Sequence, residues 1–344
     1  MNSSDTLVFG PSYVDVVIYT DERILAHDIT LDQSLPTIKA LDTKTSNEIA
    51  VTCENGSMLT IDLPYSLASF STNILCHDLE NISFFNRKIT PKSIISRLGG
   101  MGAGFAKALS AQLIYPGADD ELGSTVKSFL HEHGINAFQL DSTFKTDCSI
   151  VILNDFGEKL AFGTREQIGN MHKNKDIVTP LSKSKKAVFC GPNNDFTLNL
   201  LSKAAKSDLP KVILAPSKRN ILEGNRTPFG KLAPYTHYLA LNRSEWNMLS
   251  PTNQSAFMAN CKLITITDGS REIELIYERN RAKIAPSKVT KVIDVTRAGE
   301  TFASVMIQHL EDLINLDSVL FYAKIASEKA AEQMMMADFG FPEI

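Results

Sequence analysis

The spacing of hydrophobic residues changes along the chain. After residue 97, short apolar runs alternate with segments in which apolar residues recur every three or four positions. Short runs rich in branched residues predict buried strands, and the three-to-four spacing predicts amphipathic helices. The expected strands are 111–115, 149–153, 187–190, 211–215, 237–241 and 263–267; the expected helices are 104–113, 123–133, 196–206, 300–313 and 318–336. This alternation predicts a mostly parallel sheet with helices on both faces.

The N-terminal part of the chain has a different pattern. Residues 7–10 predict a buried strand, and residues 14–19 predict its continuation after a turn. Further on, alternating runs at 48–53 and 57–63 flank Glu54-Asn55-Gly56. An Asn-Gly pair between two such runs is a strong signal for a β-hairpin. We therefore interpret residues 20–95 as a β-rich subdomain.

Composition narrows the class of protein. The chain has 344 residues, 43% of them hydrophobic, which suffices for one large α/β domain or for a domain with a small companion. The net charge of −4 indicates neither a nucleic acid nor an anionic membrane as a partner. No apolar run approaches the roughly 20 residues of a membrane helix, and the polar N-terminus lacks a signal-peptide pattern. Five scattered cysteines without metal spacing indicate reduced thiols and a cytoplasmic protein.

The segment from Asp294 to Phe302 carries the strongest chemical signal. It follows a β-branched run and opens a helix whose apolar residues share one face. The Ala298-Gly299 step at the helix start offers backbone N–H groups to an anion. Glu300 places a carboxylate beside these groups. A phosphate-binding helix start next to a base is what phosphoryl transfer to a hydroxyl requires.

Other candidate site residues directly follow predicted strands, at the carboxyl ends of these strands. Ligands of a parallel sheet bind at the carboxyl ends of its strands, so these residues are expected to converge with Glu300. They are Gly10 and Asp15 after the first strand, Asn242 and Glu245 after residues 237–241, and Thr267 and Gly269 after residues 263–266.

Six motifs of the chain resemble those of the ribokinase family, also known as the PfkB carbohydrate kinases. They occur in family order over residues 7–18 and 97–340. The motifs are Gly10 through Asp15, Leu98-Gly99-Gly100-Met101-Gly102-Ala103-Gly104, Gly117-Ala118-Asp119-Asp120-Glu121-Leu122-Gly123, Leu241-Asn242-Arg243-Ser244-Glu245, Thr267-Asp268-Gly269-Ser270-Arg271 and Asp294 to Phe302. The double glycine alone is a weak signal, whereas six motifs in order make a strong one.

The resemblance implies an ATP-dependent kinase that phosphorylates a hydroxyl of a sugar or sugar-like molecule. It also implies a three-layer α/β/α fold with a mostly parallel central sheet and a small β-sheet lid. Residues 1–15 and 96–344 would then form the kinase domain, with a lid hairpin near residues 149–162, and residues 16–95 a β-rich lid or insertion. ATP and Mg²⁺ are the implied cofactors, with a monovalent cation as a further candidate.

The resemblance assigns roles to single residues. Glu300 would be the general base, and Arg297, Ala298 and Gly299 would complete the catalytic end of the site. The acceptor would be bound by Asp15, Gly99, Gly100, Gly104 and Arg165. The nucleotide would be bound by Asn242, Glu245, Thr267 and Gly269, and the metal by Glu245 and Asp294.

Several of these positions depart from the family pattern. Glu300 stands where the family has aspartate, and the added methylene moves the carboxylate by about 1 Å, which can cost roughly 100-fold in rate. Gly104 stands where the family often has a sugar-binding asparagine. Arg297 replaces a small residue at the edge of the anion hole, where it would either clamp a phosphate or crowd it. The segment Ala215-Pro216-Ser217-Lys218-Arg219 matches the family's Asp-Pro-Asn-x-Arg pattern only at Pro216 and Arg219.

The departures leave alternatives open. One is a catalytically weak relative that binds a nucleotide or a sugar, and another is a nucleoside kinase. Glu300 could be an ordinary charge in the first turn of a helix, and Asp15 a turn cap. Asn242 and Glu245 could form a plain helix start, and Arg165 could be a solvated surface residue. Exposed strand edges in residues 20–95 suggest a homodimer through the lid.

Overall fold

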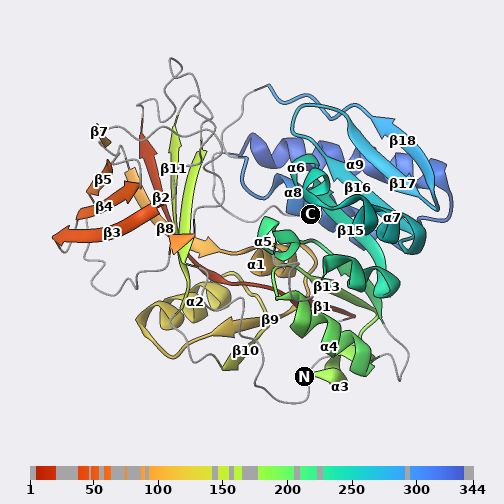
Figure 1. Cartoon of the computed structure of the whole chain (residues 1–344), viewed down its shortest axis with the longest axis horizontal. Helices are drawn as coiled ribbons and strands as arrows, with labels where there is room; N and C mark the ends of the chain where they lie inside the picture. The colour runs from red at the N-terminus through yellow and green to blue at the C-terminus, as the bar shows by residue number, and fades with distance from the viewer. Residues whose placement is uncertain are drawn as a thin grey trace.

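The computed structural model of the chain (Figure 1) describes most of its length. The described residues are 5–20, 38–45, 48–53, 58–62, 74–75, 87–89, 93–141, 146–154, 159–164, 177–204, 210–222, 228–290 and 295–336. Within these ranges the strands form one large sheet and two smaller ones. The large sheet and its helices make the body of the molecule, and the smaller sheets lie together at one side of it (Figure 1).

In the described part of the chain the large sheet has nine strands, in the order β10-β9-β1-β13-β14-β15-β16-β17-β18. The strands from β10 to β16 run parallel to one another, and β17 and β18 add an antiparallel hairpin at one edge. Their bounds are β1 (Thr6–Phe9), β9 (Gln112–Gly117), β10 (Ala137–Asp141), β13 (Lys186–Phe189), β14 (Lys211–Leu214), β15 (Thr236–Asn242), β16 (Leu263–Thr267), β17 (Ile273–Tyr277) and β18 (Asn280–Ile284). The predicted, mostly parallel sheet is confirmed.

Helices cover both faces of this sheet. One core cluster joins the sheet to α1 (Met101–Ala108), α2 (Glu121–Glu132), α8 (Ala298–Gln308) and α9 (Leu316–Met334). A second cluster joins it to α3 (Val178–Lys183), α4 (Asn194–Ala204), α5 (Lys218–Leu222), η2 (Phe229–Tyr235), α6 (Arg243–Met248) and α7 (Pro251–Asn260). Val8 belongs to the first cluster, whereas Leu7 and Phe9 belong to the second, because successive strand side chains point to opposite faces. The three-layer α/β/α fold is therefore confirmed.

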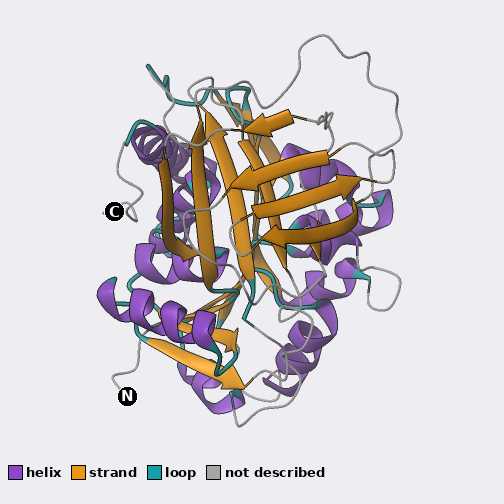
Figure 2. Ribbon diagram, turned by 90° about the vertical axis from the view of Figure 1, so that its left-hand side faces the viewer, coloured by secondary structure: helices purple, strands orange, loops and turns teal. Residues whose placement is uncertain are grey.

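A five-stranded sheet stands beside the body, in the order β6-β12-β11-β2-β8 (Figure 2). Its strands are β2 (Tyr13–Thr20), β6 (Ile74–Leu75), β8 (Ser93–Gly99), β11 (Cys148–Asn154) and β12 (Lys159–Thr164). The strand β2 follows β1 after Gly10–Ser12, and β8 leads into α1 through Gly100. The small sheet is thus attached to the body at the carboxyl end of β1, where the polar residues were expected to converge.

Both predicted hairpins have the expected antiparallel pairing. In the five-stranded sheet, called the lid sheet below, Ile152 of β11 pairs with Leu160 of β12. In a separate four-stranded sheet, Val51 of β4 (Glu48–Cys53) pairs with Leu59 of β5 (Met58–Asp62). That sheet also contains β3 (Ile38–Thr45) and β7 (Arg87–Ile89), in the order β3-β4-β5-β7. The residues of both turns lie outside the described ranges, and the division of the chain at residues 15 and 96 stays a prediction.

The helices begin slightly earlier than the hydrophobic spacing predicts. The first begins at Met101 instead of residue 104, because Gly100 ends β8 with a φ of 97° and serves as the N-cap. It ends at Ala108, well before residue 113, and β9 follows from Gln112. The helix predicted at 300–313 spans Ala298–Gln308. Apolar spacing does not mark the start of α8, since alanine and glycine occupy its first two positions.

Candidate active site

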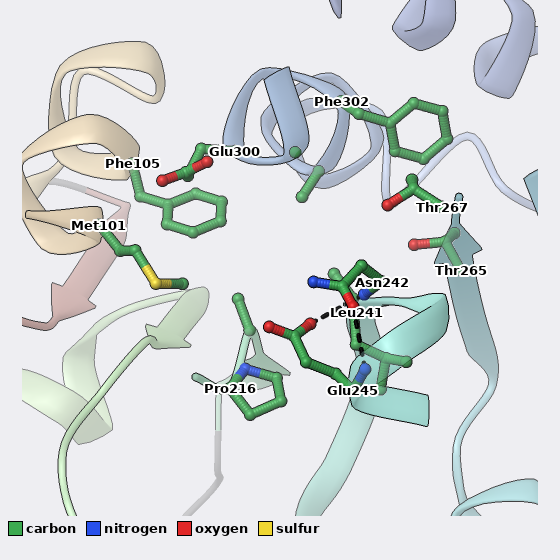
Figure 3. Close-up of a pocket in the computed structure, with 14 residues that line it drawn as sticks. Met101, Phe105, Pro216, Leu241, Asn242, Glu245, Thr265, Thr267, Glu300 and Phe302 are labelled. Atoms are coloured by element: carbon green, nitrogen blue, oxygen red, sulfur yellow. Dashed lines mark hydrogen bonds between the residues drawn. The ribbon is translucent and has the colours of Figure 1, made fainter. Parts of the chain in front are cut away.

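A cavity of about 160 Å³ lies at the carboxyl ends of β15 and β16, between these strands and the helices α1 and α8 (Figure 3). Five of the predicted site residues line it: Asn242, Glu245, Thr267, Gly299 and Glu300. Its remaining wall is mostly apolar and consists of Met101, Phe105, Ala215, Pro216, Ala240, Leu241, Thr265, Phe302 and Ala303. The structure therefore brings together residues from four of the six motifs around one space.

The start of α8 forms one end of the cavity. The N-cap residue Arg297 has φ 70° and ψ 0°, a left-handed conformation that favours glycine. The amide of Ala298 donates to the Val295 carbonyl oxygen at 3.4 Å. The amides of Gly299 and Glu300 follow in the first turn, where an α-helix has no internal acceptors for its N–H groups. Nothing lies within 4 Å of the position where Gly299 would carry a Cβ, so its backbone faces open space.

The start of α6 forms the opposite wall (Figure 3). Asn242 is its N-cap, and its side-chain oxygen accepts a hydrogen bond from the Glu245 amide at 2.9 Å. In return, the Glu245 carboxylate accepts one from the Asn242 amide at 2.8 Å. This reciprocal pair is a capping box. The plain helix-start role considered for these residues is therefore present, and it directs the Glu245 carboxylate into the cavity.

Asp15 lies outside the cavity lining, at the base of the lid sheet. It is 6% exposed and pairs across the strands β2 and β8 with Arg97, which is 8% exposed. The Arg97 Nε atom lies 3.8 Å from Asp15 Oδ2. Gly99 packs directly on this carboxylate, because a Cβ on Gly99 would lie 2.6 Å from Asp15 Cγ. At Gly100 a Cβ would collide with the Pro11 carbonyl oxygen, so the double glycine holds the turn tightly against Asp15.

The side chain of Arg297 lies on the Asp15 side of α8. It is 8% exposed, and its Nη2 atom donates to the Leu98 carbonyl oxygen at 2.5 Å. Burial, followed by the positive charge of Arg97, lowers the pKa of this guanidinium to about 10, whereas Asp15 and Glu300 act to raise it. The group is thus still charged at neutral pH. Arg297 does not line the described cavity.

Gly104 lies next to the side chains of both Arg297 and Glu300. A Cβ on Gly104 would lie 3.9 Å from Glu300 Cγ and 4.0 Å from Arg297 Nη1. The position at which the family often has asparagine is therefore adjacent to both charged side chains. Gly104 and Glu300, which come from two motifs, therefore lie beside the Arg297 guanidinium.

The nucleotide-binding prediction concerns the end of β16. Thr267 is the last residue of this strand and lines the cavity. Gly269 follows in a turn with φ 57°, and nothing lies within 4 Å of its missing Cβ. Next to it, Asp268 forms an ion pair with Arg271 at 3.1 Å. Gly269 itself does not reach the described cavity wall.

Two predicted site residues, Arg165 and Asp294, lie outside the described residues. Within the described ranges, no group of three or more His, Cys, Asp or Glu side chains is arranged to hold a metal ion. Glu245 lines the cavity and would offer a single carboxylate to a metal ion there. That arrangement fits Mg²⁺, which usually keeps several waters and needs only one or two carboxylates beside substrate phosphates.

The sequence pattern did not reveal every residue of the site. Arg97 belongs to none of the quoted motifs, and only the register of β2 against β8 places it opposite Asp15. Phe105 continues the double-glycine motif on α1, yet its place in the cavity wall depends on how α1 packs on α8. Two signals could have indicated Arg97 and Phe105. One is the double-glycine motif at residues 98–104, which they flank, and the other is the antiparallel pairing of β8 with β2.

The family model for "pfkB family carbohydrate kinase" matches residues 71–334. The chain belongs to this family. No curated protein sequence matches the chain significantly. Within the described residues, no helix is both long and apolar enough to cross a membrane.

Solved structures with the same fold include ribokinases and nucleoside kinases. A ribokinase from Giardia lamblia is 15% identical, with a TM-score of 0.66, over 97% of this chain and 94% of that one. A nucleoside kinase from Burkholderia thailandensis in complex with inosine is 12% identical, with a TM-score of 0.64, over 98% and 94%. Arabidopsis thaliana ribokinase with ribose and ATP is 14% identical, with a TM-score of 0.60, over 97% and 93%. At these identities the likeness concerns the fold.

Proposed function

We propose that the chain transfers the γ-phosphoryl group of ATP to a hydroxyl of a sugar or sugar-like small molecule. The observation that carries this proposal is the cavity between α8 and α6. The Glu300 carboxylate and the first-turn amides of α8 stand at one end, and the Glu245 carboxylate stands on the opposite wall. Family membership and the ribose, ATP and inosine complexes of proteins with this fold support the same reaction.

In this mechanism Glu300 takes the proton of the acceptor hydroxyl. The hydroxyl oxygen forms a bond to the γ-phosphorus while the bond from this phosphorus to the β–γ bridging oxygen breaks, and ADP leaves. The first-turn amides, those of Ala298, Gly299 and Glu300, stabilise the negative charge on the transferring group. The Ala298 amide contributes less, because it already donates to Val295.

The acceptor would bind on the far side of Glu300 from the α6 wall. Asp15 would accept hydrogen bonds from acceptor hydroxyls, and Gly99 and Gly100 keep the turn close enough for this contact. Gly104 and Arg297 complete this side of the site, and Arg165 is a further proposed contact. Asp15 is buried at the base of the lid sheet, and exclusion of water from the bound hydroxyl would strengthen these contacts.

The nucleotide would bind on the α6 side. Thr267 and Gly269 would contact it at the end of β16, while Asn242 holds the start of α6 in place. Glu245, with Asp294 as a second proposed ligand, would hold Mg²⁺, and a bound Mg²⁺ would neutralise charge on the phosphates.

The test compares phosphoryl transfer by the wild-type protein and two variants. The protein is incubated with ATP, Mg²⁺ and a panel of sugars and nucleosides, and ADP formation is measured. Because a general base contributes roughly 10²–10⁴-fold, Glu300→Gln is expected to lose at least 100-fold in kcat, with nucleotide binding retained. The matched control is Glu328→Gln, the same chemical change at an exposed position of α9. Equal turnover of wild type and Glu300→Gln would refute the assignment of the base.

A specific observation favours a second function, a catalytically weak protein that binds a nucleotide or a sugar. The cavity wall is largely apolar, and Ala215 stands in it where the resemblance expects a carboxylate. Stabilisation by ATP in a thermal shift experiment, without transfer to any panel member, would support this alternative. Increased turnover of Glu300→Asp would instead identify an active kinase whose base is displaced by the extra methylene. Transfer to nucleosides but not to free sugars would identify a nucleoside kinase.

A further inference from the structure

The acceptor side of the site contains four charged side chains, of which Asp15, Arg97 and Arg297 are buried and Glu300 is half-buried. The Arg297 guanidinium donates to the carbonyl of Leu98, whose neighbour Gly99 packs on Asp15, and on its other flank it lies beside Gly104, which adjoins Glu300. Arg97 pairs with Asp15. Arg97 and Arg297 are each 8% exposed. Two positive and two negative charges therefore balance within the protein before any acceptor is present. Tyr13, which pairs with Gly99 across the strands, also acts electrostatically on Arg297, and Arg297 in turn acts on His133.

Two features of the chain allow the Arg297 side chain to occupy this position: the backbone conformation of Arg297 and the absence of a side chain at Gly104. The Arg297 backbone adopts the left-handed conformation at the N-cap of α8, so the side chain leaves the helix start toward β8 and donates to the Leu98 carbonyl. Gly104 has no side chain, and a Cβ there would already lie 4.0 Å from Arg297 Nη1. The guanidinium thus fills the region that a longer side chain at position 104 would occupy.

We propose that Arg297 determines acceptor specificity and selects an acceptor that carries an anionic oxygen group, a carboxylate or a phosphate, near the reacting hydroxyl. This inference rests on the proposed kinase function and names the class of its substrate. An acceptor that approaches Glu300 from the Asp15 side meets the Arg297 guanidinium. A carboxylate or phosphate offers this group a planar or tetrahedral set of acceptor oxygens, to which a guanidinium binds through two parallel hydrogen bonds.

A neutral sugar would interact less well with the same cluster. To reach Asp15 and Glu300 it would have to displace a guanidinium that both carboxylates attract. Separating a buried charge from its partners is strongly unfavourable unless the incoming group replaces them. A neutral hydroxyl makes a weaker hydrogen bond to a guanidinium than an anionic oxygen does. The cluster therefore discriminates by charge between acceptors of similar size.

The experiment uses two matched pairs of compounds. D-Gluconate is compared with D-glucose, and D-fructose 6-phosphate with D-fructose, so the carboxylate and the phosphate are tested separately. For each compound, ADP formation with ATP and Mg²⁺ gives kcat/KM, and thermal stabilisation of the protein reports binding without transfer. The wild-type protein is expected to prefer at least one anionic compound over its neutral partner by tenfold or more.

Two variants connect this preference with Arg297. In Arg297→Gly the residue suits the left-handed backbone, and in Arg297→Gln the length is largely kept while the charge is removed. Both are expected to reduce the preference at least tenfold. Arg281→Ala, which removes an exposed arginine paired with Glu274 at the far edge of the sheet, is the control and is expected to keep it.

The outcomes separate this inference from the proposed function. Equal use or binding of anionic and neutral compounds by the wild type, or an unchanged preference in both Arg297 variants, would overturn the inference while leaving a kinase. No ADP with any acceptor, together with stabilisation by an anionic compound that depends on Arg297, would overturn the kinase function but support the inference. Absence of stabilisation and of transfer with both anionic compounds would count against the inference.

Discussion

Two glycines at the site, Gly102 and Gly299, matter because they have no side chain. Gly102 packs against the backbone after β1, because a Cβ there would lie 2.6 Å from the Gly10 carbonyl carbon and 2.7 Å from the Pro11 oxygen. Gly299, in the first turn of α8, has open space at the same point. The two glycines thus look alike in the sequence, yet one is required for packing and the other for access to the cavity.

Alanine substitutions distinguish these two roles. Gly102→Ala is expected to lower the free energy of unfolding by about 1–3 kcal/mol, because the neighbouring atoms belong to the backbone and cannot move aside. Gly299→Ala is expected to leave stability unchanged or raise it by up to about 1 kcal/mol, as alanine favours a helix. It should nevertheless weaken stabilisation by ATP, since the added methyl group enters the cavity. Urea unfolding with and without ATP measures both effects, and equal destabilisation by the two variants would contradict the expectation.

At the scale of elements, the site depends on where two helices begin. The capping box at Asn242 and Glu245 ends β15 and starts α6 at the cavity wall. Next to it, Arg243 donates to Glu274 of β17 at 2.8 Å, which ties the start of α6 to the edge hairpin. The side chain of Glu274 also pairs with Arg281 of β18 at 3.2 Å. The direction of the Glu245 carboxylate is therefore set by the helix start and by the sheet edge together.

Removing the cap of α6 should affect both stability and function. Asn242→Ala is expected to cost about 1 kcal/mol of stability, the usual effect of losing an N-cap. Ser250→Ala is the matched control, because the Ser250 hydroxyl caps α7 through the Asn253 amide at 3.2 Å and lies outside the cavity lining. Both variants should unfold at lower urea concentration, whereas only Asn242→Ala should lose stabilisation by ATP and Mg²⁺. Equal ATP effects in both variants would show that α6 does not contact the nucleotide.

At the scale of the whole molecule, stability depends on contacts between neighbouring strands of the central sheet. The β14–β15 pair shifts register between Val212 and Ile213. There the Val212 amide donates to Nδ1 of His237 at 3.2 Å, which requires a neutral imidazole. Burial, followed by the charge of Lys211, lowers the pKa of His237. Protonation of this residue therefore opposes the folded sheet.

The sign of the resulting pH dependence follows from the lowered pKa. Above the unfolded-state value of about 6.5 the imidazole is neutral in both states, and this site has no effect. As the pH falls below that value, the unfolded chain binds the proton first, so the free energy of unfolding decreases. His133, whose pKa is also lowered by burial and by Lys107, acts in the same direction. His237→Gln should flatten the decrease between pH 7 and 5 in urea unfolding, and parallel curves for variant and wild type would contradict this role.

The hydrophobic pattern predicted most of the α/β body, because strands buried on both faces and amphipathic helices leave clear periodic signals. Elements with weaker signals were not predicted, among them η2, α7 and the hairpin of β17 and β18. Within β18, for example, Arg281 and Lys283 face solvent and Ile284 is buried, so a single short strand carries little apolar pattern. The site residues Asn242, Glu245, Thr267 and Glu300 were brought together as expected, since each follows or starts an element at the same end of the sheet.

The sequence alone determined the family motifs, the parallel sheet and the carboxylate at the start of α8, because these depend on residue type and on spacing along the chain. The tertiary structure decided which charges meet. Only the register of β2 against β8 places Arg97 opposite Asp15. Only the left-handed N-cap of α8 and the bare position at Gly104 bring Arg297 to the Leu98 carbonyl and beside Glu300. These contacts join residues far apart in sequence, and no local pattern specifies them.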